Sequence, residues 1–502
     1  MPPLCNTGVP GLDEVLCGGL SPDRLYLVDG EPGTGKTTLG LQFLLAGRDA
    51  GERVMYVTLS ETAEELRSTA DSHGWSLDGI DVIELNELQP RVDEAYTLFH
   101  PSEVELQETV GIILRAIEDR SPARVVVDSL SEMRLLARDP LRFRRQILSL
   151  KQFFVGRRCT TILLDDRSAP DGDMQLHSLA HGVVVLEHLA MEYGADRRRL
   201  EVRKLRGSQF FGGFHDFRIR TGGLLLYPRL ETGAPIQKLQ AKTIESGVSE
   251  LDAMLGGGVT SGTSTLVTGA AGTGKSILCL HYGLAAAVRG EAVKFYLFDE
   301  RVAVFRARAQ ALGLPLRAAE KSGRVVLHQI EPTQMSPGEF SHLVRTAVER
   351  DGASMVVIDS INGYLQAMPS EKLLSIQVHE LLSYLANHNV TSILTLVQRG
   401  IFGSPIEEAA EVSYLADTVI LLRYFEHAGT VRQAMSTVKK RSGRHERTIR
   451  EYRIDRGGLR VGEPLVTFRG VLTGTPEYEG REEPLMGGRT DAAPARDRYR
   501  HG

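Results

Sequence analysis

The chain contains 502 residues, of which 42% are hydrophobic and 25% are charged, a composition typical of folded globular proteins. This length is sufficient for two or three domains, each with its own hydrophobic core. The net charge of −5 argues against a general nucleic-acid binder, so nucleic acid is not an expected partner.

The sequence indicates neither a membrane protein nor a secreted protein. Its apolar runs are all shorter than a membrane span, so no membrane partner is expected. The amino-terminal residues do not show a basic region followed by an apolar core, so no secretory signal is expected. The four cysteines are scattered and form no Cys-x-x-Cys pair, which favours reduced thiols. We therefore expect a cytoplasmic protein.

A phosphate-binding loop follows the first predicted strand, Leu25–Val28. Residues Gly30–Thr37 show the pattern G-x-x-x-x-G-K-[ST], and Thr38–Ala46 continues with apolar residues at helical spacing. Glycines let successive N–H groups point at phosphate oxygens, and the helix N-terminus adds partial positive charge. The alternative is a glycine-rich turn that happens to precede a lysine. The expected ATP-binding residues are Gly30, Gly33, Thr34, Gly35, Lys36, Thr37 and Thr38.

The same pattern occurs again at Gly269–Ser276, between the apolar run Ser264–Thr268 and a predicted helix that starts at Ile277. Lys275 lies 239 residues after Lys36, and the sequence around both loops keeps this spacing. Such a register indicates an internal duplication, which chance matches do not produce. The second set of expected ATP-binding residues is Gly269, Gly272, Thr273, Gly274, Lys275, Ser276 and Ile277.

Strands and helices alternate in both halves of the chain. This order predicts an α/β fold with two tandem P-loop domains, each a mostly parallel sheet flanked by helices. The predicted helices of the first half after the P-loop helix are Thr62–His73, Val104–Asp119 and Leu141–Phe154. The predicted strands after the P-loops are Val54–Leu59, Val82–Leu85, Arg124–Asp128, Thr160–Leu164, the antiparallel pair Val183–Glu187 and Leu200–Leu205, and in the second half Val293–Phe298, Val325–Gln329, Met355–Asp359, Thr391–Val397, Thr418–Leu422 and Met435–Lys439.

Composition also divides the chain into domains. The boundary is expected near Gly233–Pro235, which gives an amino-terminal domain at residues 1–235 and a carboxyl-terminal domain at residues 236–475. Residues 476–502 are polar and rich in glycine and proline, so we expect a flexible tail.

Two apolar strands end in an Asp-Ser pair, at Asp128 and at Asp359. A P-loop needs such an acid, together with its own hydroxyl residue, to hold Mg²⁺ at the phosphates of ATP. An aspartate at a strand end is often only a cap, but two in matched contexts favour the metal role. The expected magnesium ligands are Thr37, Asp128, Ser276 and Asp359.

Acidic residues also end the strands that follow the two P-loop helices. Glu61, and Asp299 with Glu300, are candidates for orienting or deprotonating the attacking water. The alternative for Glu61 is an acid that stabilises the N-terminus of the next helix. Hydrolysis also needs positive charge near the developing phosphate charge. Candidates late in each half are Lys204, Arg206, Lys439 and Arg441, and the alternative for these is a solvated basic strand edge.

These motifs occur in the same order in both halves of the chain, and this arrangement resembles that of the KaiC family. The family consists of RecA-like ATPases and includes the cyanobacterial circadian-clock autokinase. The resemblance covers roughly residues 5–475 and includes G-[VI]-x-x-L-D-x-x-L-x-G-G before each P-loop. It implies two tandem RecA-like domains in a double-ring homohexamer, with ATP between subunits. It also implies that Lys204, Arg206, Lys439 and Arg441 reach ATP on the neighbouring chain.

Two positions depart from the family pattern. Ser60 replaces the first acid of a pair, which leaves Glu61 alone in the first half. In the clock protein the second ring phosphorylates a Ser-Thr pair, and the matching residues here are Ser413 and Tyr414. Ser413 is therefore a candidate phosphorylation site for a Ser/Thr autokinase, while an ordered two-site cycle is not expected.

Three functions follow from these patterns. The first is an ATP-hydrolysing hexameric regulator that binds ATP and Mg²⁺, assembles with itself and has a regulatory protein partner of unknown identity. The second is a RecA-type DNA-dependent ATPase, recombinase-like or helicase-like, which would need basic or aromatic loops in a pore. The candidate loops are Met133–Arg138, which is slightly basic, and Asn362–Gln366, which is neutral. The third is a nucleotide-gated scaffold with little turnover.

Overall fold

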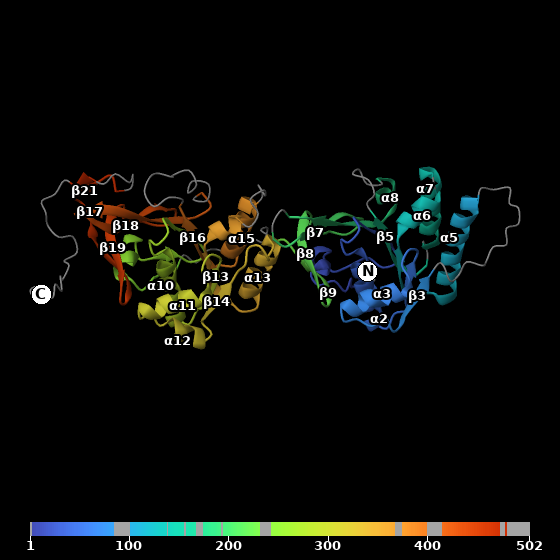
Figure 1. Ribbon diagram of the computed structural model, residues 1–502, viewed down its shortest axis with the longest axis horizontal. Coiled ribbons are helices and arrows are strands. Elements are labelled where there is room, and N and C mark those ends of the chain that lie inside the picture. Colours follow the sequence, from blue (N-terminus) through green and yellow to red (C-terminus); the bar gives the residue numbers. More distant parts are fainter. Residues whose placement is uncertain are drawn as a thin grey trace, which may run out of the picture. The chain divides into compact units, whose positions relative to one another are not determined.

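The computed structural model describes residues 3–84, 101–137, 139–154, 157–166, 174–191, 194–230, 242–366, 374–398, 414–471 and 477–478. The chain divides into two units, Met1–Arg229 with Thr333–His342, and Leu230–Pro332 with Leu343–Gly502. Each unit is built around a nine-stranded sheet flanked by helices (Figure 1). The predicted fold class, two tandem RecA-like P-loop domains with mostly parallel sheets, is confirmed.

In the first sheet, six neighbouring strands run parallel and the last three strands continue antiparallel. The P-loop strand therefore lies in the interior of the sheet, where both of its faces are covered. In spatial order the strands are β3 (Ile80–Glu84), β2 (Val54–Thr58), β4 (Arg124–Asp128), β5 (Thr160–Asp166), β1 (Leu25–Gly30), β6 (Gly182–Leu189), β7 (Arg197–Leu205), β8 (Phe214–Arg220) and β9 (Gly223–Tyr227).

Helices cover both faces of this sheet because its central strands are apolar on both faces. In β2, Tyr56 joins a core that includes Phe43 of α2 (Lys36–Asp49) and Leu66 of α3. Its neighbours in β2 face the other core, which includes Phe143 of α7. The described helices of the first half are α1 (Leu12–Val15), α2, α3 (Ala63–Ser72), α5 (Pro101–Arg120), α6 (Leu130–Ala137), α7 (Pro140–Phe154) and α8 (Met174–Leu179).

The second half of the chain repeats the strand order of the first. In spatial order its large sheet contains β14 (Val325–Gln329), β13 (Ala292–Leu297), β15 (Ala353–Asp359), β16 (Thr391–Val397), β12 (Ser264–Gly269), β17 (Thr418–His427), β18 (Thr430–Lys440), β19 (Ile449–Asp455) and β20 (Gly458–Pro464). Its described helices are α9 (Ser249–Met254), α10 (Lys275–Val288), α11 (Val302–Ala311), α12 (Leu316–Lys321), α13 (Pro337–Glu349), α14 (Ile361–Gln366) and α15 (Leu374–Asn387).

Two short antiparallel pairs complete the described strands. β10 (Thr243–Ile244) pairs with β11 (Val259–Thr260), and β21 (Phe468–Arg469) pairs with β22 (Glu477–Tyr478). Of the predicted tail, the structure describes Glu477 and Tyr478, the two residues of β22. The predicted domain boundary lies among residues 231–241, which are outside the described ranges. Within the part of the chain that the structure describes, the helices are too short or too polar to cross a membrane.

The structure differs from the sequence-based prediction at two places in each half. The stretches predicted as pore loops are helical: Met133 lies in α6, with its side chain buried beside that of Leu130, and Asn362 lies in α14. The loop prediction was therefore wrong, because helices of eight and six residues next to a buried strand are stabilised by packing and are too short to show a clear periodic pattern. The antiparallel strands β8, β9, β19 and β20 were not predicted.

Candidate nucleotide-binding sites

Each P-loop connects a central strand to the N-terminus of a long helix. The first runs from the end of β1 to Lys36, the first residue of α2, and the second runs from the end of β12 to Lys275 of α10. Gly35 and Gly274 precede these helices with φ angles of 104° and 91°. A Cβ at Gly274 would lie 2.1 Å from the terminal methyl group of Ile454, so a larger residue would need this side chain to move as well as a strained backbone conformation.

The lysine of each P-loop is buried and is bound by its own loop. Lys36 Nζ donates hydrogen bonds to the carbonyl oxygens of Gly30 and Glu31, both at 2.8 Å. Lys275 Nζ donates to the carbonyl oxygens of Gly269 and Ala270, at 2.9 and 2.8 Å. Both ammonium groups are thus held at the mouth of the loop. Burial lowers the pKa of Lys275 to about 8.

The other predicted ATP-binding residues hold the loops in shape or line the sites. The Thr34 hydroxyl donates to the carbonyl of Glu31, and the Thr273 hydroxyl donates to the carbonyl of Ala270, both at 2.8 Å. Thr38 Oγ1 lies 3.4 Å from His73 Nε2. Gly33 and Gly272 both have a φ of 79°.

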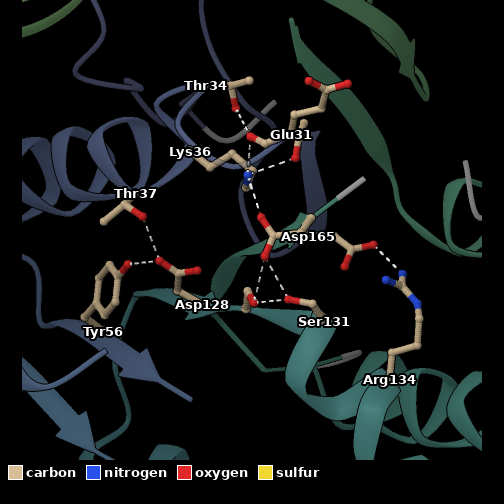
Figure 2. A network of polar contacts seen from close by, with 12 residues as sticks. Glu31, Thr34, Lys36, Thr37, Tyr56, Asp128, Ser131, Arg134 and Asp165 are labelled. Atoms are coloured by element: carbon tan, nitrogen blue, oxygen red, sulfur yellow. Dashed lines mark hydrogen bonds and ion pairs between the residues drawn. The ribbon is translucent and has the colours of Figure 1, made fainter. Parts of the chain in front are cut away.

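In the first half, the predicted magnesium ligands lie within contact distance of each other. Thr37 Oγ1 donates to Asp128 Oδ2 at 2.9 Å, and the buried Tyr56 hydroxyl donates to the same oxygen at 2.5 Å (Figure 2). Burial raises the pKa of Asp128, although the hydrogen bonds from Tyr56 and Thr37 act in the opposite direction. The strand end and the P-loop helix therefore bring two oxygen ligands together, as a magnesium site requires.

In the second half, the matching acid has a different partner. Asp359 Oδ1 accepts a hydrogen bond from the Thr395 hydroxyl at 2.5 Å. Ser276 and Asp359 both line a cavity of about 490 Å³, a size suited to a nucleotide. The cavity is lined by Ala271, Gly272, Gly274, Lys275, Ser276, Ile277, Asp299, Glu300, Arg308, Leu312, Asp359, Val397, Gln433 and Ile454.

The candidate catalytic acids differ in their surroundings. One carboxylate oxygen of Glu61, Oε2, is buried and has no hydrogen-bond partner among the described residues. Burial, and then the nearby charge of Asp128, raise the pKa of Glu61. Burial also raises the pKa of Glu300, but an ion pair with Arg308 at 2.6 Å offsets part of the rise. Asp299, its neighbour, accepts a hydrogen bond from the Ser360 hydroxyl.

The lysine of the first P-loop also binds an acid that was not predicted from the sequence. Lys36 Nζ lies 2.8 Å from Asp166 Oδ1, at the end of β5. The other carboxylate oxygen of Asp166 accepts hydrogen bonds from Ser131 at 2.9 Å and from Ser129 at 3.5 Å. Asp165, beside it, forms an ion pair with Arg134 of α6 at 2.5 Å (Figure 2). Two acids directly after the apolar run of β5 were the available signal, since Asp128 shows the same pattern.

The candidate basic residues lie away from the P-loop of their own unit. Lys204 of β7 is paired with Val183 of β6, which lies beside Leu27 of β1. Its Nζ donates to the carbonyls of His177 and Ala180, at 2.6 and 2.7 Å, on the amino-terminal side of β6. The P-loop starts at the other end of β1, three residues or about 10 Å further along the strand. Lys204 therefore points away from it.

The other three basic residues have the same placement. Arg206 Nη2 donates to the carbonyl of Ser178 at 2.9 Å. Lys439 of β18 donates to the carbonyl of Ala416 at 2.7 Å, before β17 begins. Arg441 Nη2 donates to the carbonyl of Tyr414 at 2.9 Å. All four side chains thus lie at the amino-terminal edge of their sheets, whereas the P-loops lie at the carboxyl-terminal edge. Ser413, the candidate phosphorylation site, lies outside the described residues.

Two P-loops, each following a buried strand and each accompanied by an acid at the end of a nearby parallel strand, define a P-loop ATPase with two tandem RecA-like domains. Comparison with known protein families identifies the family to which this ATPase belongs. The chain belongs to the KaiC family: the model of the KaiC ATPase matches residues 5–231 and 244–466, one match for each half.

Curated relatives match nearly the whole chain. The circadian clock protein KaiC3 of Synechocystis sp. (strain ATCC 27184 / PCC 6803 / Kazusa) is 27% identical over 492 residues, which cover 95% of each chain. The circadian clock oscillator protein KaiC of Parathermosynechococcus lividus is 27% identical over 482 residues, covering 94% of this chain and 88% of the relative. The circadian clock oscillator protein KaiC of Synechococcus elongatus is 26% identical over 487 residues, covering 94% of this chain and 91% of the relative.

Proposed function

We propose that the protein is an ATP-hydrolysing regulator that assembles into a homohexamer of two stacked rings, with ATP and Mg²⁺ between neighbouring subunits. One observation carries this proposal. In both units the P-loop lies at one edge of the sheet, and the candidate basic residues lie at the opposite edge. Each site is therefore incomplete within one chain, and a ring of identical chains completes it.

The geometry supports a division of roles within each interface. The P-loop, with Lys36 or Lys275, binds the phosphates of one chain's nucleotide. The neighbouring chain supplies Lys204 and Arg206 in one ring, and Lys439 and Arg441 in the other. A basic residue supplied in this way stabilises charge on the transferred phosphoryl group and contributes about 10³–10⁵ in rate in P-loop enzymes.

The residues at each P-loop fit a magnesium ion, because Mg²⁺ prefers oxygen ligands: the first site has a hydroxyl bound to a carboxylate, and the cavity of the second is lined by a hydroxyl residue and a carboxylate. Thr37 and Asp128 would hold the ion in the first site, and Ser276 and Asp359 in the second. An ion held there would supply positive charge beside the phosphates of ATP and so offset their negative charge. Glu61 and Glu300 would accept the proton of the attacking water, since burial raises the pKa of each carboxylate toward the working pH.

Subunit complementation tests this proposal. One variant carries Lys36→Ala and Lys275→Ala, so that it binds no phosphate, and a second variant carries Arg206→Ala and Arg441→Ala. Each alone is expected to release almost no phosphate from ATP. Mixed oligomers are expected to recover part of the activity, because some interfaces then combine an intact P-loop with intact basic residues. An absence of recovery, in mixtures shown to exchange subunits, contradicts the proposal.

Mass measurement with and without ATP and Mg²⁺ tests the assembly. A hexamer that forms with nucleotide is the expected result, and a chain that stays monomeric contradicts it. Rings that form without phosphate release would instead identify the nucleotide-gated scaffold. A salt-dependent shift of single-stranded DNA, with hydrolysis that depends on the DNA, would identify the DNA-dependent ATPase.

A second activity, autophosphorylation on Ser413, is favoured by the position of the next residue. The carbonyl of Tyr414 accepts a hydrogen bond from Arg441, a residue assigned above to the neighbouring subunit's ATP. Ser413, which lies outside the described residues, is the residue before Tyr414 in the sequence. Labelled ATP and Mg²⁺ are expected to label the protein, and Ser413→Ala is expected to remove the label. Persistent labelling of this variant contradicts the assignment.

A further inference from the structure

The position of Asp166 has an exact counterpart in the second half, where the residue is apolar. Asp166 pairs with Gly30, the last residue of β1, and Val397 pairs in the same register with Gly269, the last residue of β12. Val397 lines the cavity around Lys275. The end of this strand therefore faces the nucleotide site, and only the first half places a carboxylate there.

The carboxylate of Asp166 is held in place from two sides. One oxygen binds Lys36, whose side chain is only 7% exposed, and the other accepts the hydroxyl of Ser131 from α6. Burial opposes ionisation, but the hydrogen bond and charge of Lys36, with the hydroxyls of Ser131 and Ser129, hold the pKa of Asp166 below its usual value. Asp166 is thus an anion paired with the ammonium group of Lys36, the group that binds phosphate in a P-loop.

The second half shows what the site looks like without this anion. Asn362, which matches Ser131, binds the backbone of Val397: its Nδ2 donates to the carbonyl at 3.0 Å, and its Oδ1 accepts from the N–H at 2.6 Å. Lys275 forms hydrogen bonds only to loop carbonyls among the described residues. The second residue of the helix therefore binds the Asp166 side chain in the first half and the backbone of Val397 in the second.

We propose that Asp166 is a specificity residue of the first site, which competes with the terminal phosphate of ATP for Lys36 and lowers the preference of that site for ATP over ADP. The inference rests on the proposed nucleotide binding. A P-loop lysine reaches the β- and γ-phosphates, so ATP must displace Asp166 and then tolerate its charge beside the γ-phosphate. ADP lacks the γ-phosphate and meets less of this repulsion.

The test measures binding of ATP and of ADP to the full-length chain by calorimetry, with Mg²⁺ present. In a Lys275→Ala background, which leaves the first site, Asp166→Val is expected to raise the affinity for ATP about tenfold and that for ADP less, as expected for loss of one competing charge-assisted contact. Asp166→Asn keeps the shape and is expected to behave in the same way.

The reciprocal change provides the matched control. In a Lys36→Ala background, which leaves the second site, Val397→Asp is expected to lower the affinity for ATP relative to ADP. An unchanged ratio of ATP to ADP affinity in Asp166→Val and in Asp166→Asn overturns the role of Asp166, because a merely structural residue would alter both nucleotides equally. If neither nucleotide binds the Lys275→Ala chain at all, the proposed function of the first site falls together with this inference.

Discussion

The two nucleotide sites share one backbone and differ in the charges placed around it. In the first site, Asp166 pairs with the P-loop lysine, and Tyr56 donates a hydrogen bond to the strand-end acid. Two further acids, Asp165 and Asp29, lie at the ends of the neighbouring strands β5 and β1. At the matching positions the second site has Val397, Phe295, Leu396 and Thr268. The second site instead pairs its candidate catalytic acid, Glu300, with Arg308.

This difference shows which features a duplicated domain keeps and which it changes. Backbone hydrogen bonds and glycine conformations bind phosphate in any P-loop, so both halves retain them. Side chains at the strand ends decide how strongly the site competes with phosphate and how its catalytic acid titrates, and these side chains have diverged. Two sites on one chain are therefore expected to differ in affinity and in pH dependence.

The largest expected effect is on hydrolysis. Glu61→Gln, in a Lys275→Ala background, is expected to reduce phosphate release by about 10²–10⁴-fold, the usual contribution of a general base. Glu300→Gln in a Lys36→Ala background is expected to lose as much, since one carboxylate oxygen of Asp299 already accepts a hydrogen bond from Ser360. Glu65→Gln is the control, because Glu65 is an exposed acid that caps α3. Nearly full activity in Glu300→Gln would show that Asp299 shares the role.

The second effect is the pH dependence of ATP binding at the second site. ATP favours the charged form of Lys275, whose pKa is about 8 in the free protein, so binding above this pH must take up a proton. In a Lys36→Ala background, the affinity for ATP is expected to fall up to about tenfold per pH unit above about pH 8. Calorimetry at pH 9 in two buffers of different ionisation enthalpy measures the proton uptake. A second site that binds without uptake contradicts this expectation.

The third effect separates the two candidate catalytic acids. Arg308→Ala removes the charge that lowers the pKa of Glu300, so this pKa is expected to rise and the acidic limb of second-site hydrolysis to move to higher pH. Activity at about pH 6 is then expected to fall severalfold, and activity at alkaline pH to change less. Arg306→Ala is the control, because Arg306 lies on the same helix and binds Glu320. Equal losses at all pH values would indicate a structural role for Arg308.

The smallest effect concerns stability of the first unit. Tyr56→Phe introduces the residue of the second half and removes a hydrogen bond to the buried Asp128, which is expected to cost about 1–3 kcal/mol of unfolding free energy. The chain's single tryptophan, Trp75, lies in the first half, so its fluorescence during urea unfolding follows that unit. Tyr26→Phe is the control, since the Tyr26 hydroxyl binds a neutral carbonyl, that of Ser21. A smaller loss for Tyr56→Phe than for Tyr26→Phe contradicts the prediction.

Local pattern was sufficient to predict the α/β fold, the duplication and both P-loops. Glycines at Gly35 and Gly274 and the lysines that follow them act through the backbone of the same short segment, so their spacing in the sequence is their spacing in space. The central strands were equally clear, because strands buried on both faces read as continuous apolar runs. The strand-end acid Asp128 followed from the same pattern.

The tertiary structure alone decided which of these groups meet. Asp166 and Lys36 are 130 positions apart, and they touch because β5 and β1 are neighbours in the sheet. Strand β8 was missed because it mixes exposed and buried residues, and the edge strand β9 was missed because its apolar run is only five residues long. The opposite placement of Lys204 and the P-loop also depends on strand direction, which no local pattern states. The sequence by itself determined the two P-loop segments. The order of strands in the sheet determined which charged side chains lie beside them.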